Sequence, residues 1–369
     1  MSRYPYTVVL IVPTGIGAAI GGYAGDALPV AKAIAQVADR LITHPNVLNG
    51  AQLYWSLPNA LYVEGYGLDR FACGEWGLRP VYQNRIGLLL DRAIEPDLRL
   101  RHLQAADAAR ATLGLNLTEY VITDAPLGIE LQTAPSGATW GSLRNPDSLL
   151  RAAEKLITQA GATAIAVVAR FPDDPDSLAL QNYRYAQGVD PLAGAEAIIS
   201  HLIVRTFHIP CAHAPALSPL PLDAHLSPRA AAEELGYTFL PCVLVGLSQA
   251  PQFVTPSPVT DHQAIAEPEF SLAQSNPGDI GSNQVNAVIV PASACGGSAI
   301  LSLGNCQAQI IAVEENSTQM QAPPEKFGIR ALRVHSYLEA LGVLVAHRAG
   351  IVPQALKSIV DPIRLLNRD

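Results

Sequence analysis

The stretch Thr7-Val8-Val9-Leu10-Ile11-Val12 runs directly into Pro13-Thr14-Gly15-Ile16-Gly17, and more glycines follow at Gly21-Gly22 and Gly25-Asp26. Near the other end of the chain, Asn286-Ala287-Val288-Ile289-Val290-Pro291 runs into Ala292-Ser293-Ala294-Cys295-Gly296-Gly297-Ser298. In both places an apolar, strand-like run ends in glycines and passes into a helix-like stretch. Such a turn aims unpaired backbone N–H groups and a positive helix end at one spot, where an anion can bind. We therefore expect a ligand between the two glycine-rich turns.

Strand-like runs alternate with stretches of helical spacing along the rest of the chain. The expected strands cover residues 40–44, 61–63, 85–91, 119–123, 164–169 and 309–313, and the expected helices cover 28–38, 95–113, 147–161, 190–206 and 331–347. This alternation predicts an α/β fold with mainly parallel sheets, built from Rossmann-like βαβ units.

We expect two lobes around a cleft, with an N-terminal lobe at residues 1–145 and a C-terminal lobe at residues 146–369. Residues 251–284 are rich in Pro, Ser, Gln, Asn and Asp, and they predict a long loop or lid. Ligands bind at the carboxyl ends of the strands in parallel sheets, and both glycine-rich turns are expected there.

Composition limits the classes of function. Apolar residues make up 49% of the 369 residues and charged residues 15%, which excludes a disordered chain. The formal net charge of -8 argues against a nucleic-acid partner, because nucleic-acid affinity depends on Lys and Arg at phosphates. Five cysteines without a CxxC pair predict free thiols in a reducing compartment. No signal peptide or membrane span is recognised, so we expect a cytoplasmic protein without a membrane partner, compatible with a homo-oligomer.

The first turn supplies one group of candidate ligand-binding residues. Its glycine spacing is GxGxxxGGxxGD and departs from the dinucleotide fingerprint GxGxxG, so the cofactor stays unassigned. We expect a phosphate or carboxylate to be cradled by Gly15, Gly17, Gly21, Gly22, Gly25 and Asp26. In the alternative interpretation, the glycines only permit a tight turn and Asp26 caps the following helix.

A second group follows the next expected strand, in Thr43-His44-Pro45-Asn46 and at Asn49. Here Asn46 and Asn49 are candidate ligand-binding amides, and His44 is a candidate acid or base near neutral pH. Pro and Asn are also common in turns, so a purely structural turn is the alternative.

The second glycine-rich turn supplies a candidate nucleophile. Cys295 precedes a double glycine at an expected helix N-terminus, a position that lowers a thiol pKa and favours the thiolate. The neighbouring candidates for ligand binding are Ser293, Gly296, Gly297 and Ser298. Cysteine is also common and inert in protein cores, which is the alternative for Cys295.

The strand after this turn ends in Val313-Glu314-Glu315-Asn316. Glu314 and Glu315 are candidate catalytic acids or hydroxyl ligands, and Asn316 is a candidate ligand-binding residue. Adjacent residues of a strand point to opposite faces, so at most one of the two acids should face a site. The alternative is the solvated start of a loop.

Three histidines, His201, His208 and His213, are close enough in sequence to suggest a metal site. They lack an HExxH or HxxE spacing, and no metal is assigned to them. The acidic turn Asp173-Asp174-Pro175-Asp176 is interpreted as a solvated loop for the same lack of a specific pattern.

The two glycine-rich turns, with Thr43-His44-Pro45-Asn46 and Val313-Glu314-Glu315-Asn316, resemble an α/β family of cyanobacteria and plastid-bearing eukaryotes. That family is a domain of unknown function, so the resemblance implies a photosynthetic source and a soluble, enzyme-like protein but no activity. The chain is more loosely similar to two-domain glycosyltransferases of the double-Rossmann type, in the placement of Gly21-Gly22 and Gly296-Gly297-Ser298. It departs from them at Tyr23, where they normally have a histidine.

The sequence therefore favours an enzyme that binds a small anionic metabolite, which is phosphorylated, nucleotide-bearing or a carboxylate, between the two turns. A more specific form of this hypothesis is an enzyme that catalyses glycosyl or similar group transfer. A cysteine-dependent isomerase or lyase using Cys295 is one alternative, and a non-catalytic metabolite sensor is the other.

Overall fold

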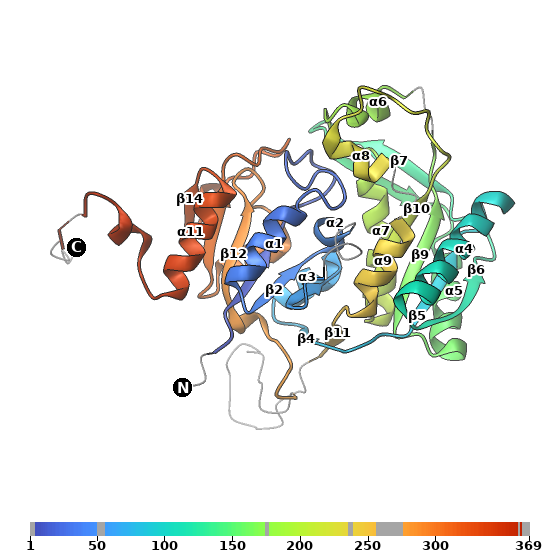
Figure 1. The fold of residues 1–369 in the computed structure, drawn as a ribbon, viewed down its shortest axis with the longest axis horizontal. Coiled ribbons are helices and arrows are strands. Elements are labelled where there is room, and N and C mark those ends of the chain that lie inside the picture. Colours follow the sequence, from blue (N-terminus) through green and yellow to red (C-terminus); the bar gives the residue numbers. More distant parts are fainter. Residues whose placement is uncertain are drawn as a thin grey trace.

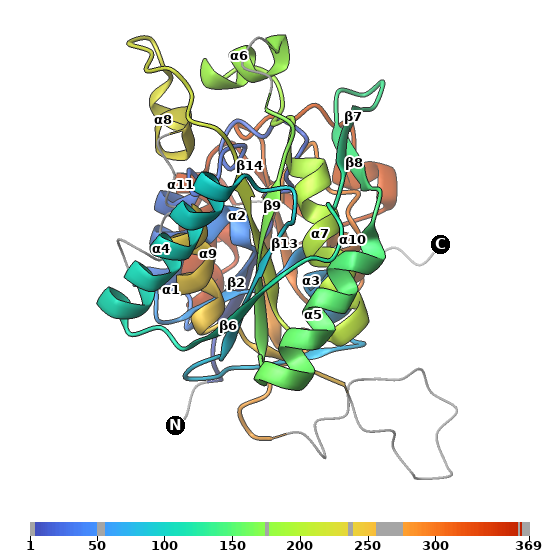
Figure 2. The same cartoon turned by 90° about the vertical axis from the view of Figure 1, so that its right-hand side faces the viewer.

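The computed structural model describes residues 4–49, 56–173, 177–234, 239–255, 276–360 and 362–363. Within these residues the chain forms two parallel sheets with helices packed against them, as Figure 1 and Figure 2 show. This arrangement confirms the predicted α/β fold with mainly parallel, Rossmann-like sheets.

The larger sheet has six strands in the order β14-β13-β12-β1-β2-β3, and all neighbouring strands are parallel. Read from the other edge, the order is β3-β2-β1-β12-β13-β14. When these six strands are numbered in chain order, this is the strand order of the doubly wound Rossmann fold. β1 pairs directly with β12, so the two glycine-rich turns follow neighbouring strands where the order reverses. The strands are β1 (Thr7–Leu10), β2 (Arg40–Thr43), β3 (Ala60–Tyr62), β12 (Val285–Pro291), β13 (Gln309–Val313) and β14 (Ala331–Val334).

The smaller sheet has four parallel strands in the order β10-β9-β5-β6, and its order reverses between β5 and β9. Two antiparallel pairs, β7 with β8 and β4 with β11, complete the strands that the structure describes. Their bounds are β5 (Ile86–Leu90), β6 (Leu117–Ile122), β9 (Ala164–Arg170), β10 (Cys211–Ala216), β7 (Ile129–Thr133), β8 (Thr139–Leu143), β4 (Gly77–Arg79) and β11 (Gln252–Val254).

The two sheets do not follow the division expected at residue 145. The six-stranded sheet takes its strands from both ends of the chain, and the four-stranded sheet takes its strands from the middle. Residue 145 falls inside the middle segment, between β8 and α5 (Pro146–Ala160). The physical reason is the parallel pairing of β1 with β12, which joins segments that lie far apart in the sequence.

Helices fill the space between the sheets and cover their outer faces (Figure 1). α3 packs on α10 and α7, and α9 packs on β9, β10 and α4. One buried apolar cluster includes Leu10 of β1, Val168 of β9 and Leu244 of α9, so the two sheets share a core. The helices are α1 (Leu28–Val37), α2 (Pro45–Leu48), α3 (Gly65–Ala72), α4 (Pro96–Leu113), α6 (Leu178–Arg184), α7 (Ala193–Phe207), α8 (Pro228–Glu234), α9 (Phe239–Ser248), α10 (Ser298–Gly304) and α11 (Tyr337–Arg348).

Three expected elements differ in the structure. Residues 331–347 are not one helix, because β14 pairs with β13 and Ser336 then caps α11 by accepting the N–H of Glu339. The helix expected from residue 190 begins at Ala193. Part of the expected loop at 251–284 forms β11 and a short 3-10 helix at Ser282–Gln284, and residues 256–275 lie outside the described part of the chain.

Candidate functional site

The first glycine-rich turn is held by contacts within the protein. The N–H of Gly21 donates to Oδ1 of Asp26 at 2.7 Å, and the N–H of Gly25 donates to the carbonyl of Asn46 at 2.7 Å. The Asn46 amide donates in turn to the carbonyl of Gly21 at 2.7 Å. Asp26 therefore stabilises the turn from inside and does not cap the helix. The N–H groups of Gly21 and Gly25 already donate hydrogen bonds within the protein.

The remaining glycines of this turn permit close packing. Gly15 and Gly17 have φ values of 69° and 67°, which strain other residues. Gly15 lies against β8, where its carbonyl accepts the N–H of Thr139 at 2.9 Å. A Cβ at Gly22 would lie 2.3 Å from the carbonyl oxygen of Ala18. These contacts support the structural alternative for the three glycines.

His44, Asn46 and Asn49 also hold the fold together. Nε2 of His44 accepts the N–H of Val12 at 3.1 Å, and Oδ1 of Asn49 accepts the hydroxyl of Tyr62 at 2.7 Å. Burial lowers the pKa of His44 to about 4. The imidazole is therefore neutral at pH 7, contrary to the expected acid or base near neutral pH.

The second turn leads into a helix whose N-terminus already carries a carboxylate. Oδ1 of Asp69, in α3, accepts the N–H of Ala299 at 3.0 Å, in the first turn of α10. Gly297 and Ser298 begin this helix, and a Cβ at Gly296 would lie 3.0 Å from the Phe327 ring. Asp69 thus occupies the position expected for an anionic ligand, and a second negative charge there would be repelled.

Cys295 has the opposite character from the predicted nucleophile. Its side chain is fully buried, and burial raises its pKa to about 11. Sγ faces the carbonyl oxygens of Pro291 and Ala292 at 3.7 and 3.8 Å. The thiol is therefore protonated and inaccessible at pH 7, as is typical of a core cysteine. The neighbouring Ser293 hydroxyl lies 2.8 Å from that of Thr318.

The acidic stretch after β13 is divided among three structural roles. Glu314 is exposed and lies 3.3 Å from Arg333, and Glu315 accepts the N–H of Tyr337 at the start of α11. Asn316 is buried and ties the first turn to the loop after β13, because it accepts the N–H of Ile20 and donates to its carbonyl, both at 2.8 Å. It also donates to the hydroxyl of Tyr337 at 2.7 Å.

An open depression beside the second turn contains two cationic side chains that already have partners. Arg333 pairs with both oxygens of Glu325 and with Glu314. Lys326 donates to the carbonyl of Gln321 at 2.8 Å. The depression is lined by Ala292, Ser293, Glu314, Ser317, Thr318, Gln321, Pro323, Lys326 and Arg333. Its positive charge is therefore largely neutralised within the protein.

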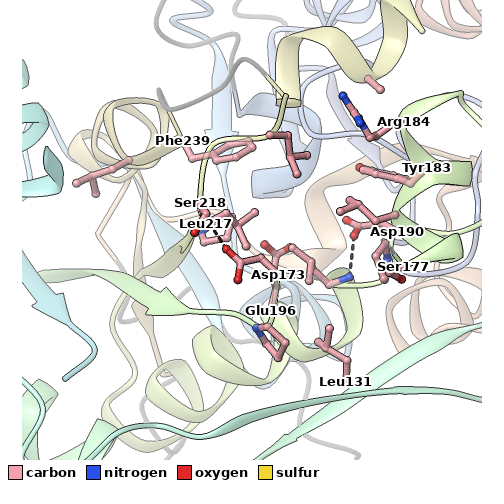
Figure 3. A pocket seen from close by; sticks show the side chains of 18 of the residues that line it. Leu131, Asp173, Ser177, Tyr183, Arg184, Asp190, Glu196, Leu217, Ser218 and Phe239 are labelled. Atoms are coloured by element: carbon pink, nitrogen blue, oxygen red, sulfur yellow. Dashed lines mark hydrogen bonds between the residues drawn. The ribbon is translucent and has the colours of Figure 1, made fainter. Parts of the chain in front are cut away.

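A cavity of about 200 Å³ lies at the carboxyl ends of β9 and β10 in the smaller sheet (Figure 3). Sequence reasoning missed it, and its described lining contains no residue of either glycine-rich turn. Its walls are mainly apolar, formed by Leu131, Leu180, Leu192, Leu217, Phe239 and Leu240, among others. Its polar side chains include His102, Asp173, Ser177, Arg184, Asp190 and Glu196.

The most perturbed group in this cavity is Asp190. Burial, reinforced by the nearby charge of Glu196, raises its pKa to about 8, so the carboxyl carries a proton at pH 7. Its Oδ1 accepts the N–H of Leu192 at 2.8 Å, which fixes its orientation before α7. By contrast, Asp173 is ionised, because it pairs with Arg170 at 3.0 Å and accepts the N–H of Ser218.

A chain of polar side chains lies behind the cavity. Glu64, at the start of α3, contacts Nδ1 of His201 and also accepts the hydroxyl of Ser200 at 3.4 Å. Nδ1 of His213 lies 3.3 Å from that hydroxyl, and its Nε2 lies 3.8 Å from Glu196. The structure thus brings His201 and His213 together through Ser200.

His208 lies apart from this chain, against the ring of Trp76 at 4.7 Å. Across the part of the chain that the structure describes, no three His, Cys, Asp or Glu side chains form a metal-binding group.

The cavity wall formed by α6 contacts the first glycine-rich turn. The rings of Tyr183, in α6, and Tyr23 stack at 4.5 Å, and each hydroxyl donates to the other segment's backbone, at the carbonyls of Gly22 and Tyr183. Arg229, in α8, pairs with Asp26 at 2.9 Å. Because Tyr183 also lines the cavity, the turn braces the wall of a site that it does not itself form.

The buried imidazole of His44 predicts a pH-dependent stability. Its pKa of about 4 in the folded protein lies below the ordinary value of 6.5, so the unfolded chain binds the proton more tightly. Stability is therefore lost as pH falls from 6.5 towards 4, by up to about 3 kcal/mol from this residue. Urea unfolding of the native protein and of His44→Gln, which does not titrate, should show diverging pH profiles. Parallel profiles would contradict this assignment.

The Asn316 contacts predict a large loss of stability on truncation. Asn316→Ala removes a fully buried amide and leaves the half-buried N–H and carbonyl of Ile20 without their partner, and we expect the free energy of unfolding to fall by about 3 kcal/mol. Glu314→Gln, at an exposed position of the same loop, should change it by less than about 0.5 kcal/mol. Denaturant unfolding measures both, and equal losses in the two variants would exclude the proposed tie.

Comparison with known proteins assigns the chain to a family. Residues 7–357 match the family described as "Protein of unknown function (DUF3326)". An uncharacterized lipoprotein of a Synechococcus strain is 60% identical over 350 residues, covering 95% of this chain and 93% of its own length. The glycotransferase of kitacinnamycin is 11% identical and covers 74% of this chain and 91% of its own, but its TM-score of 0.15 carries no argument.

The relative's name also bears on location. It is called a lipoprotein, which contradicts the cytoplasmic location expected from the sequence, and that expectation is withdrawn. Among the described residues, no helix has the length and apolar character needed to cross a membrane. With the match spanning almost the whole chain and a close cyanobacterial relative, the protein belongs to the DUF3326 family of proteins of unknown function.

Proposed function

We propose that this protein binds a small molecule in the cavity above the four-stranded sheet and acts on it as an acid–base enzyme. The cavity lies at the carboxyl ends of parallel strands, next to the place where the strand order reverses, which is the usual ligand position in such sheets. Its apolar walls with a few polar groups are typical of small-molecule sites.

The observation that carries the proposal is the position of the Asp190 carboxyl, which lines this apolar cavity together with Glu196 and has no ion pair with a lysine or arginine among the described residues. A carboxyl with a pKa of about 8 can exchange a proton at neutral pH, as general acids and bases do. The hypotheses based on the glycine-rich turns have less support. Asp69 occupies the second helix N-terminus, and the buried Cys295 thiol does not suit an isomerase or lyase nucleophile.

A ligand sensor without turnover is the second candidate. It is favoured by Tyr183, which lines the cavity and stacks on Tyr23 of the first turn. A ligand that displaces this ring would alter the contacts of residues 13–26. A sensor therefore predicts a ligand-dependent change in amide hydrogen exchange of that turn without conversion of the ligand.

Blocking the cavity tests the site itself. We expect small aromatic fragments to bind the native protein in ligand-observed NMR, and Leu217→Trp to weaken this binding at least tenfold by filling the space. Leu338→Trp, at an exposed position of α11, is the matched control and should bind like the native protein. Leu180→Trp, on the opposite wall in α6, serves if Leu217→Trp does not fold. Unchanged binding in folded cavity variants would place the ligand elsewhere.

A further inference from the structure

We infer that the cavity selects a ligand whose apolar body carries one basic amine, held as an ammonium against the carboxyl groups of Asp190 and Glu196. This rests on the proposed role of the cavity as the ligand site. It replaces the anionic metabolite expected from the sequence, because the site offers acids where an anion would need cations.

The charges around the cavity carry this inference. Of its three acids, Asp173 is already paired with Arg170. Arg184 also lines the cavity, where Tyr183 lies between it and Asp190 in Figure 3, and it donates to the carbonyl of Pro221 at 2.8 Å. No ion pair with a lysine or arginine is found for Asp190 or Glu196 within the described residues. An arriving ammonium would thus supply the cation that these two carboxyls lack.

Behind the cavity, Glu196 lies near one basic side chain but makes no hydrogen bond with it. Its nearest basic group is His213, whose Nε2 lies 3.8 Å from Oε2, beyond hydrogen-bond distance. The other ring nitrogen of His213 faces Ser200, which is in turn bonded to Glu64. His213 is thus positioned by the polar chain behind the cavity, and Glu196 keeps acceptor capacity for a ligand.

The apolar walls explain why the ligand needs more than an amine. Leu131, Leu192, Leu217 and Phe239 enclose the space next to the acids. Each CH₂ group buried there gains about 0.8 kcal/mol. A small hydrophilic amine would leave these walls uncovered, so an amine attached to an aromatic or branched apolar body fits best.

Binding should be coupled to proton release. The ammonium pairs with the ionised form of Asp190, so the carboxyl gives its proton to the buffer while the amine keeps its own. Affinity should therefore rise from pH 6 to pH 8, as the carboxyl with a pKa of about 8 becomes easier to ionise. Among the described residues, the titratable or charged groups that line the cavity with Asp190 are Glu196, Asp173, His102, Tyr183 and Arg184, with His213 behind Glu196. Burial lowers the pKa of His102, which leaves it uncharged at pH 7.

The test compares three probes of nearly equal size: 2-phenylethylamine, 2-phenylethanol and phenylacetate. Isothermal titration at pH 7 should give at least tenfold tighter binding for the amine than for the alcohol, and the weakest binding for the carboxylate. The heat of amine binding should differ between phosphate and Tris buffers, because a proton is released. In Asp190→Asn with Glu196→Gln, the amine and the alcohol should bind within threefold of each other.

The control removes the same two charges from exposed positions, with Asp107→Asn and Glu154→Gln, and should keep the preference for the amine. Asp190→Asn alone replaces the double variant if that does not fold. Equal binding of amine and alcohol to the native protein would overturn the inference and leave the cavity as a ligand site. Retained preference in the double variant would also overturn it. If none of the three probes or the fragments binds, the proposed function itself fails.

Discussion

The parallel pairing of β1 with β12 is the constraint on which the rest of this structure depends. Leu10 pairs with Ile289 in the centre of the six-stranded sheet, although the two residues lie far apart in the chain. This pairing closes the Rossmann sheet from both ends of the sequence and leaves the middle segment to form the second sheet. It also brings the two glycine-rich turns to the same edge, where Asn316 ties the first turn to the loop after β13.

Side chains of the protein itself occupy the positions in the two turns where an anionic ligand was expected. Asp26 binds the first turn from within, Asp69 occupies the helix N-terminus after the second, and the pair of Tyr23 and Tyr183 links the first turn to the smaller sheet. A helix N-terminus attracts any carboxylate within reach, whether it belongs to a ligand or to the chain. The open space lies instead above β9 and β10, where Asp190 and Glu196 face apolar walls and have no ion pair with a lysine or arginine among the described residues.

Much of the fold could be predicted because its central strands are continuous apolar runs. Ala164–Arg170 and Val285–Pro291 are buried along almost their whole length, and their composition marks them as parallel strands. β10 was missed because Cys211-Ala212-His213-Ala214-Pro215-Ala216 lacks the β-branched and aromatic residues typical of strands. Local sequence alone does not separate the two states, because Ile209-Pro210-Cys211-Ala212 leads into a strand whereas the similar Leu240-Pro241-Cys242-Val243 lies in a helix.

The candidate site could not be predicted in the same way. Glycine spacing shows where a tight turn is needed, but the sequence does not show that Asp69 reaches Ala299 from another helix. Nothing in the sequence around Asp190 marks a ligand site, and only the folded chain surrounds it with leucines and places Glu196 nearby. The sequence grouped His201, His208 and His213 without assigning a metal, and it does not show that His201 and His213 meet carboxylates and a serine while His208 lies apart.

The protonation state of Asp190 is the central claim of this account, and isotope-edited NMR of the aspartate carboxyl groups tests it most directly. Comparison of the native protein with Asp190→Asn identifies the signal, which can then be followed through a pH titration. A midpoint near pH 8 is the predicted result. A midpoint near the ordinary aspartate value of about 4 would mean that the cavity solvates this carboxyl well, and it would contradict the acid–base site.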